Sequence, residues 1–107
     1  MTDIVIVLTT VANDDRAEPF ARQLIEERLA ACVNLYPAMS SFYRWKGRIE
    51  RDAERQVVIK TTRDRLAGLE ARIKELHAYE LPELLVIPVD AGSQEYLNWV
   101  SGQAGSG

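Results

Sequence analysis

Apolar positions along the chain recur with two different periods, which predicts strands alternating with helices. Residues 3–10 are β-branched and almost continuously apolar, a pattern typical of a strand buried on both faces. Farther along, apolar side chains recur at spacings of three and four, which predicts an amphipathic helix with Pro19 in its first turn. Polar residues 13–16 precede this helix and offer capping side chains. The stripe that the helix is expected to bury comprises Ala17, Phe20, Ala21, Leu24, Ile25 and Leu29.

A long β-hairpin is predicted in the middle of the chain. Residues 32–36 return to strand character, and Pro37 restricts this strand to an edge, a bulge or a bend. Residues 40–47 favour extended structure, and residues 48–53 are interpreted as a strand end followed by a turn. Residues 54–61 are then expected to run back alongside the first strand.

A second amphipathic helix follows the hairpin. Thr61 or Thr62 can cap it, and Asp64 can complete a capping box from Thr61. The helix is expected to end before Pro82, because the residue preceding a proline is pushed out of helical space. Its buried stripe is predicted to be Leu66, Leu69, Ile73 and Leu76.

The last part of the chain predicts a strand, a short helix and a tail. Residues 84–90 have strand character, and Pro88 marks this strand as an edge strand or a bulged one. Residues 94–100 predict a short helix, and residues 101–107 are rich in Gly and Ser, which is typical of a flexible tail. We therefore expect one domain over residues 1–100 and a mobile segment over residues 101–107.

The predicted order is β-α-β-β-α-β plus a terminal helix, which indicates an α+β fold of the ferredoxin-like sandwich type. Right-handed crossovers then place both main helices on one face of an antiparallel sheet. Residues 32–61 are more than a plain hairpin needs, so an extended hairpin is expected to project from the body. Its unpaired strand edges favour aggregation unless another chain covers them, and the sequence therefore predicts an oligomer.

Composition and charge exclude several classes of partner. The 107 residues carry a formal net charge of −3, with 47% hydrophobic and 27% charged residues. An acidic, globular composition argues against nucleic acid or an anionic membrane as the main partner. Cys32 is the only cysteine, which excludes an intrachain disulfide and a multi-cysteine zinc site. Apolar runs are too short to span a bilayer and the start lacks a basic region, so we expect a cytoplasmic protein.

Five segments, in order and in register, resemble the CutA divalent-cation tolerance family. The resemblance extends from about Ile4 to Val100, nearly the whole chain. One of these segments alone would be weak evidence, whereas five together are specific. They are ERLAACVN at 27–34, SFYRWKGRI at 41–49, VIKT at 58–61, HAYELPE at 77–83 and YLNW at 96–99.

The resemblance implies a compact homotrimer of ferredoxin-like subunits, similar in architecture to the PII nitrogen regulators. It also implies a role in tolerance of copper and other divalent cations, without an enzymatic reaction. The family's usual His-Pro-Tyr-Glu motif has Ala78 in place of proline here. The metal-ligand positions proposed for some members match Thr9, Leu76 and His77, and of these only His77 can ligate copper strongly.

His77 is the only histidine and has two interpretations. As a ligand it would hold copper(II) together with nearby oxygen donors, namely Tyr79, Glu80 and Glu83, and with groups from a second subunit. As a structural residue it would be stabilised as a cation at the end of the preceding helix. A single histidine does not satisfy a transition metal by itself, so both interpretations stay open.

The remaining candidates are aromatic or basic. Tyr43 and Trp45 alternate with basic residues, so their rings share one face, either as packing groups or as part of a binding cleft. Lys60 is either an ion-paired lysine or a contact for an anionic ligand. An RNA-recognition module is excluded, because residues 55–60 lack the aromatic side chains that such a module needs.

The first functional hypothesis is a trimeric protein that binds copper or another ligand in a cleft between subunits, lined by Tyr43, Trp45, Lys60, Tyr79 and Glu80. The second is a PII-like signalling module that binds a small anionic metabolite through Lys60 and passes a signal to an unidentified protein partner. A scaffold that binds copper only incidentally is a third. Catalysis with His77 as general base lacks an oxyanion stabiliser, and we expect no enzyme.

Overall fold

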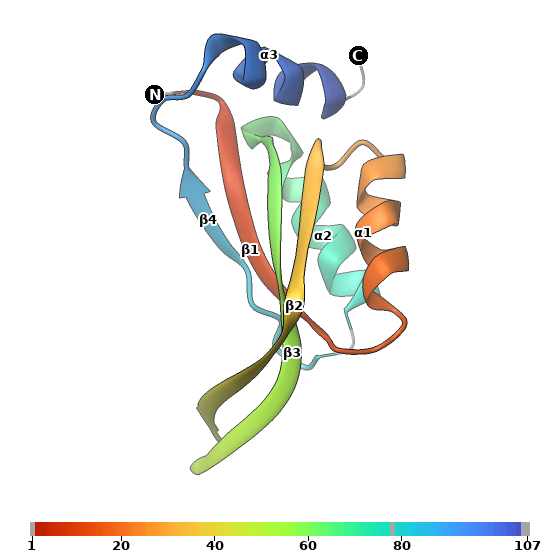
Figure 1. Ribbon diagram of the computed structural model, residues 1–107, viewed down its shortest axis with the longest axis vertical. Coiled ribbons are helices and arrows are strands. Elements are labelled where there is room, and N and C mark those ends of the chain that lie inside the picture. Colours follow the sequence, from red (N-terminus) through yellow and green to blue (C-terminus); the bar gives the residue numbers. More distant parts are fainter. Residues whose placement is uncertain (1, 78, 106–107) are drawn as a thin grey trace.

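A computed structural model describes residues 2–77 and 79–105 as an antiparallel sheet with helices packed on it (Figure 1). The strand order in the sheet is β2-β3-β1-β4, which is the ferredoxin-like arrangement that the sequence predicts. β1 and β3 are central, and β2 and β4 are the two edge strands. The elements are β1 Ile4–Ala12, α1 Ala17–Glu26, β2 Cys32–Trp45, β3 Arg48–Thr62, a 3₁₀ turn Arg63–Arg65, α2 Leu66–Leu76, β4 Leu85–Pro88 and α3 Gln94–Gln103.

The helices α1 and α2 lie together on one face of the sheet, as expected from right-handed crossovers (Figure 1). Alternate residues of β1 and β3 face them, because side chains of a strand point to opposite faces in turn. The salt bridge between Arg72 and Glu27, with an N···O distance of 2.9 Å, links α2 to the end of α1. The main core consists of Val5, Val7, Val11, Ala17, Phe20, Leu24, Ala30, Val57, Ile59, Leu69 and Ile73.

The ends of the two main helices differ from the predicted ones. α1 stops at Glu26, because Arg28 adopts a left-handed φ of 57° that no helix can continue through. Leu29 lies beyond the helix and still packs against the core. The capping box from Thr61 is wrong, because the Thr61 hydroxyl donates to the Leu29 carbonyl at 2.8 Å. It is the Thr62 hydroxyl that donates to the Asp64 carboxylate.

The β2–β3 hairpin extends beyond the body of the molecule, as predicted, and gives it dimensions of 44 × 26 × 24 Å (Figure 1). The turn predicted at residues 48–53 is wrong, because β3 is continuous from Arg48 onward. Two residues make the turn instead, Lys46 with φ 51° and Gly47 with φ 79°. Positive φ at both central positions is the requirement of a type I′ turn, and its twist matches the twist of the strands.

Both prolines in strands lie where the sequence places them. β2 is an edge strand with an irregular register between Leu35 and Ala38, in keeping with the edge, bulge or bend predicted at Pro37. Pro88 ends β4, which pairs with β1 on one side only. Within the described part of the chain, no helix is both long and apolar enough to cross a membrane.

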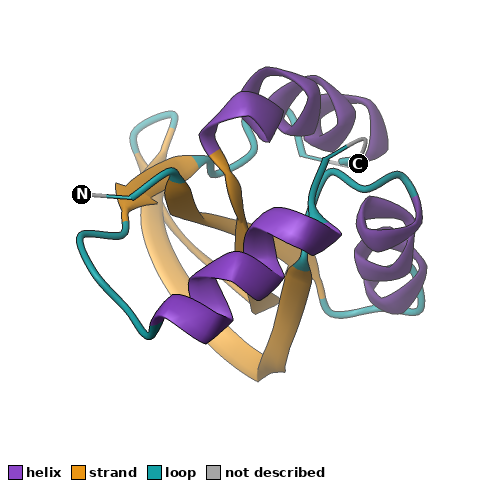
Figure 2. Cartoon of the chain, turned by 90° about the horizontal axis from the view of Figure 1, so that it is seen from above, coloured by secondary structure: helices purple, strands orange, loops and turns teal. Residues whose placement is uncertain are grey.

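The C-terminal segment is more ordered than its Gly/Ser content suggests. α3 continues to Gln103, and Ala104 is only 4% exposed. The Gly105 amide donates to the Arg28 carbonyl at 2.9 Å, and Arg28 Nε donates to the Gly105 carbonyl at 2.7 Å. Residues 101–105 therefore belong to the fold, which corrects the predicted boundary at residue 100. Residues 106–107 lie outside the described ones. Figure 2 shows α3 lying across the end of the sheet.

Two fully buried threonines on neighbouring strands predict opposite effects of the same substitution. The Thr9 hydroxyl has no hydrogen-bond partner, whereas the Thr61 hydroxyl donates to a carbonyl. We expect Thr9→Val to raise the free energy of unfolding by about 1 kcal/mol, because an unpaired buried hydroxyl is costly. Thr61→Val should lower it by about 1–3 kcal/mol, because the Leu29 carbonyl loses its donor. Urea denaturation measures both, and a destabilised Thr9→Val protein would contradict the unpaired hydroxyl.

Candidate functional site

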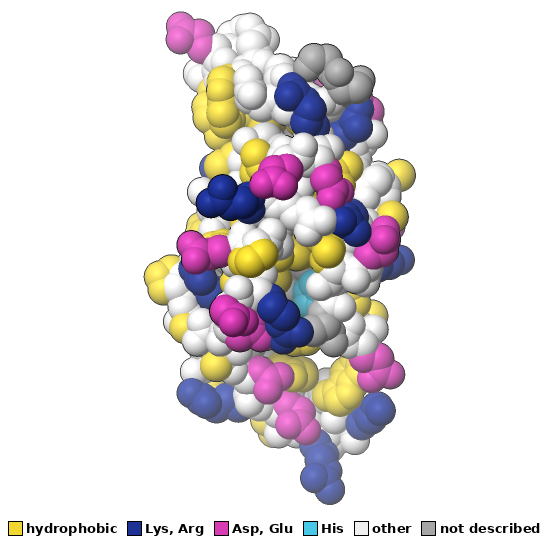
Figure 3. Space-filling model, turned by 90° about the vertical axis from the view of Figure 1, so that its right-hand side faces the viewer, with side chains coloured by type: hydrophobic (Ala, Val, Ile, Leu, Met, Phe, Trp, Pro, Cys, Tyr) yellow, Lys and Arg dark blue, Asp and Glu magenta, His cyan; other side chains and the backbone are white. Residues whose placement is uncertain are grey.

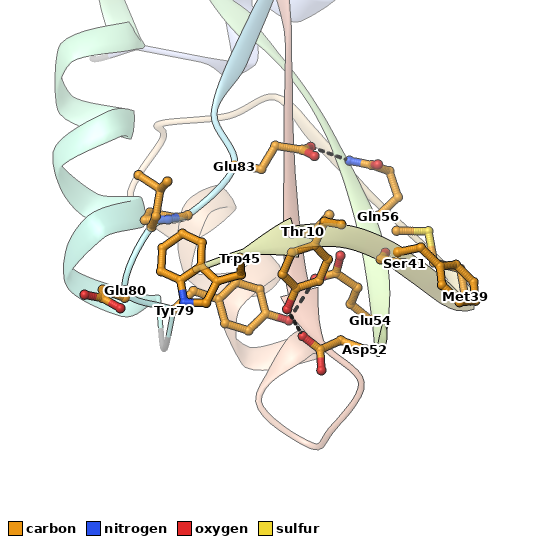
Figure 4. Close-up of a pocket in the computed structure, with 14 residues that line it drawn as sticks. Thr10, Met39, Ser41, Trp45, Asp52, Glu54, Gln56, Tyr79, Glu80 and Glu83 are labelled. Atoms are coloured by element: carbon orange, nitrogen blue, oxygen red, sulfur yellow. Dashed lines mark hydrogen bonds between the residues drawn. The ribbon is translucent and has the colours of Figure 1, made fainter. Parts of the chain in front are cut away.

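A hollow of about 800 Å³ lies beneath the β2–β3 hairpin, and we call it the hairpin pocket. Figure 4 shows side chains of β1, β2 and β3 and of the segment after α2 gathered around it. Four of the five cleft residues predicted from the sequence line it, namely Tyr43, Trp45, Tyr79 and Glu80. The other lining residues are Thr10, Met39, Ser41, Phe42, Asp52, Glu54, Gln56, Leu81, Pro82 and Glu83.

The strand β3 contributes three polar side chains to the pocket at every second position. Asp52, Glu54 and Gln56 share one face because side chains alternate along a strand. Neither Asp52 nor Glu54 was among the candidate residues, because Asp52 fell in the turn predicted at residues 48–53 and Glu54 was expected only to begin the returning strand. A continuous strand through this segment would have put both carboxylates on the face of the pocket.

Two tyrosine hydroxyls donate to these carboxylates. The Tyr43 hydroxyl donates to Asp52 Oδ2, and the Tyr79 hydroxyl donates to Glu54 Oε2 at 2.9 Å. The bond to Asp52 is the main cause that raises the pKa of Tyr43 to about 12. Burial is the main cause that raises the pKa of Tyr79, and its bond to Glu54 raises it further. Both phenols are therefore neutral donors at physiological pH.

The pocket is acidic. Its lining contains four carboxylates, Asp52, Glu54, Glu80 and Glu83, and no Lys, Arg or His among the residues described. Glu54 is only 9% exposed. Over the helix-bearing side of the molecule, by contrast, basic and acidic side chains are interspersed (Figure 3). A concave site lined by one sign of charge attracts the opposite sign, so the hairpin pocket favours cations and disfavours anions.

Gln56 holds the segment after α2 against the sheet. Its amide Nε2 donates to the Thr9 carbonyl at 2.7 Å and to Glu83 Oε2 at 3.0 Å. Figure 4 shows this Gln56–Glu83 pair on one side of the pocket and Glu80 on the outer side. The pair fixes the wall of the pocket opposite the hairpin.

His77 lies next to the pocket but does not line it. Its Nε2 bonds the Thr10 carbonyl, and its Nδ1 accepts from the Tyr79 amide at 3.2 Å. Its ring also packs edge-on against Phe20, with centroids 6.4 Å apart, and against Tyr79 at 4.6 Å. With both ring nitrogens occupied, the geometry favours a structural role in which His77 positions Tyr79, which differs from the helix-end cation that the structural interpretation expects.

Copper ligation by His77 stays a prediction, because the described residues of a single chain do not surround it with further metal ligands. Among the described residues, no three His, Cys, Asp or Glu side chains are grouped so that they could hold a metal ion. Of the other positions matched to the family's proposed ligands, Thr9 is fully buried and Leu76 packs against the core. Ala78, which replaces the proline of the family motif, lies outside the described residues.

Lys60 does not line the pocket. It pairs with Ile6 of β1 and with Cys32, the first residue of β2, so it lies at the base of the hairpin, away from the turn. It shares a face of β3 with Gln56, but four residues farther along, a separation of about 13 Å. Within one chain the structure therefore does not bring Lys60 together with Tyr43, and a shared lining of a cleft between subunits stays a prediction for this residue.

The Tyr43–Asp52 bond predicts an alkaline titration. The pKa of Tyr43 is about 12 in the folded protein against about 10 for a free tyrosine, so the bond is intact below pH 10 and lost as the pH rises through 12. At about pH 11, Asp52→Ala should give one additional tyrosinate per chain by ultraviolet absorbance. Glu50→Ala is the control, because Glu50 faces Tyr43 across the hairpin and acts only through its charge. An equal gain in both variants would contradict the hydrogen bond.

The chain is similar to one family of proteins over almost its full length. The family model described as CutA1 divalent ion tolerance protein matches residues 5–103. The divalent-cation tolerance protein CutA of Thermus thermophilus is 42% identical over 100 residues, which cover 94% of this chain and 97% of that protein.

Two solved structures show how close the folds are. The structure of CutA1 from Oryza sativa superimposes with a TM-score of 0.94 at 34% identity, covering 99% of this chain and 97% of that one. The structure described as PII-like protein CutA from Nostoc sp. PCC 7120 in apo form superimposes with a TM-score of 0.88 at 42% identity. It covers 94% of this chain and 97% of its own.

Proposed function

Because the chain belongs to the CutA1 divalent ion tolerance family, we propose that it acts in divalent-cation tolerance as a homotrimer. The proposed trimer binds a cation in the hairpin pocket. One observation carries the proposal: the pocket has four carboxylates and, among the described residues, no basic side chain in its lining. The role is binding rather than catalysis, in keeping with relatives that are named as tolerance proteins. A cytoplasmic location and a protein partner belong to the same proposal.

Exposed apolar side chains on strands support the assembly. On the edge strand β4, Leu85 is 57% exposed and Ile87 is 45% exposed. On the hairpin, Phe42 and Ile49 are exposed even more fully. Unpaired strand edges that carry apolar residues associate with other chains, and closed symmetric assembly removes them. In a trimer, the hairpin pocket would lie at the cleft between subunits.

A divalent cation in this pocket would need donors from more than one chain. The described residues of one chain lack a group of three ligands, and copper(II) prefers nitrogen and oxygen donors in a defined geometry. Carboxylates of the pocket would supply part of the donor set, and the neighbouring subunit the rest. Copper binding is therefore expected to depend on trimer formation.

A PII-like module that binds an anionic metabolite has less support. The likeness to the Nostoc protein concerns the fold, and fold alone does not define a ligand. The acidic lining of the pocket repels an anion. Lys60, the residue expected to bind one, lies elsewhere on the sheet.

Calorimetric titration of the metal-stripped protein with copper(II) tests the proposed function. We expect saturable binding that Glu54→Gln weakens by about tenfold, because a charge-assisted contact is lost while the acceptor for Tyr79 is kept. Glu26→Gln, which makes the same charge change on the exposed side of α1, is the matched control and should bind normally. Equal affinities for all three proteins, or no saturable binding, would overturn the proposal.

A further inference from the structure

We infer that the hairpin pocket binds an organic cation, a protonated amine on an aliphatic or aromatic body, in preference to a bare metal ion. This inference rests on the proposed function, which requires a positively charged ligand. It goes beyond the proposed function because it names the chemical class of that ligand. Three features of the pocket carry it: its size, its carboxylates and its rings.

The size of the pocket fits a small organic molecule. Ligand pockets usually measure about 300–1,000 Å³, and the hairpin pocket encloses about 800 Å³. A metal ion needs several donors converging within about 2–2.6 Å of one point. No group of three such donors exists among the described residues, so the pocket is too wide for an ion alone within one chain.

The carboxylates of β3 are placed to accept N–H groups. Glu54 is nine-tenths buried, and among the described residues its Oε2 accepts from a neutral phenol, that of Tyr79. Within the described part of the chain, neither its Oε1 nor the carboxylate of Asp52 has a cationic partner in the pocket. A buried carboxylate is stabilised by a cation that donates hydrogen bonds to it. An ammonium group between Asp52 and Glu54 supplies that cation.

The rings suit the body and the charge of such a ligand. Tyr43, Trp45 and Tyr79 line the same hollow, and Figure 4 shows the Tyr79 ring turned toward Asp52 and Glu54. Aromatic faces attract ammonium groups within about 6 Å of the ring centroid. The hairpin already shows this preference, because the Lys46 ammonium lies 5.9 Å from the centroid of the Trp45 ring. A bare divalent ion gains little from such rings, whereas an organic amine uses both its charge and its apolar body.

Fluorescence of Trp45 provides a direct test, because Trp45 and Trp99 are the two tryptophans of the chain. In a Trp99→Phe background, spermidine should change the fluorescence saturably, and the neutral chain 1,8-octanediol should not. Glu54→Gln should weaken spermidine binding by about tenfold, and Glu26→Gln, with the same change in net charge, should not. Trp45→Leu, followed by calorimetry, should also weaken it. Equal responses to spermidine and octanediol, or equal losses in both charge variants, would overturn the inference.

A parallel titration with copper(II) separates this inference from the proposed function. Binding of copper without spermidine overturns the inference and leaves the proposed function standing. Binding of spermidine without copper supports the inference and overturns the divalent-cation role. Absence of both overturns both. Spermidine binding that appears only when the trimer is dissociated would mean that a neighbouring subunit fills the pocket, which also overturns the inference.

Discussion

Replacing Ile73 with alanine is expected to lower the free energy of unfolding by about 2–5 kcal/mol. The Ile73 side chain is fully buried where α2 packs on the sheet, in the cluster that contains Leu24 and Ile59. Truncation removes buried methylene groups and leaves a cavity that the surrounding strands cannot close. A domain of this size has about 5–15 kcal/mol of stability in total, so the loss is a large share of it.

Denaturation by urea, followed by circular dichroism, measures the effect of this substitution. Lys74→Ala is the matched control, because Lys74 is the next residue of the same helix and is exposed. The control should change the stability by no more than about 0.5 kcal/mol. If Ile73→Ala were as mild as Lys74→Ala, the packing of α2 against the sheet would be wrong.

Replacing Ile87 with lysine is expected to convert the proposed trimer into monomers. Ile87 lies on the edge strand β4, 45% exposed, and pairs with Ile6 on the sheet face that α1 and α2 leave uncovered. A lysine there places a charge on an apolar strand edge, which is how natural proteins keep edge strands from associating. Sedimentation should show a mass near 12.1 kDa instead of three times that value.

Glu18→Lys is the control for this substitution. It introduces the same side chain on α1, on the opposite face of the sheet, and should leave the trimer intact. A trimer that survives Ile87→Lys would show that β4 is not part of the contact. A wild-type protein that sediments as a monomer would contradict the proposed assembly itself.

The order and pairing of the elements were predictable because periodicity and proline placement are local signals. Short apolar runs rich in β-branched residues indicated the strands, and Pro37 and Pro88 fall on the edge strands β2 and β4. The family resemblance is confirmed by the matching family model. The hairpin turn was misplaced because charged residues 48–53 resemble a loop, whereas the turn depends on positive φ at Lys46 and Gly47.

The candidate site was only partly predictable, because its members meet through the fold. Tyr43, Trp45, Tyr79 and Glu80 do line one pocket, and the two hairpin rings share a face as their spacing predicts. Glu54 was missed although it was predicted to begin the returning strand, because its pairing with Met39 across the hairpin was not foreseen. The partners of His77 could not be foreseen, since one of them, the Thr10 carbonyl, is 67 residues away along the chain.

Lys60 illustrates a different limit. Lys60 was expected in the same cleft as the pocket residues because the sequence places it at the end of a strand. The pocket, however, lies toward the hairpin end of β3, and Lys60 lies toward the other end. The register with Ile6 and Cys32 places it away from the hairpin tip. Strand register depends on long-range pairing, which a single sequence specifies only weakly.

Native mass spectrometry of the metal-stripped protein, then titrated with copper(II), tests most directly whether this chain is a trimeric cation-binding protein. We predict a species at three times 12.1 kDa that takes up copper to a discrete plateau. Glu54→Gln should keep that mass and need about tenfold more copper to reach the plateau. A monomer of 12.1 kDa, or a trimer that adds copper without a plateau, would contradict the account.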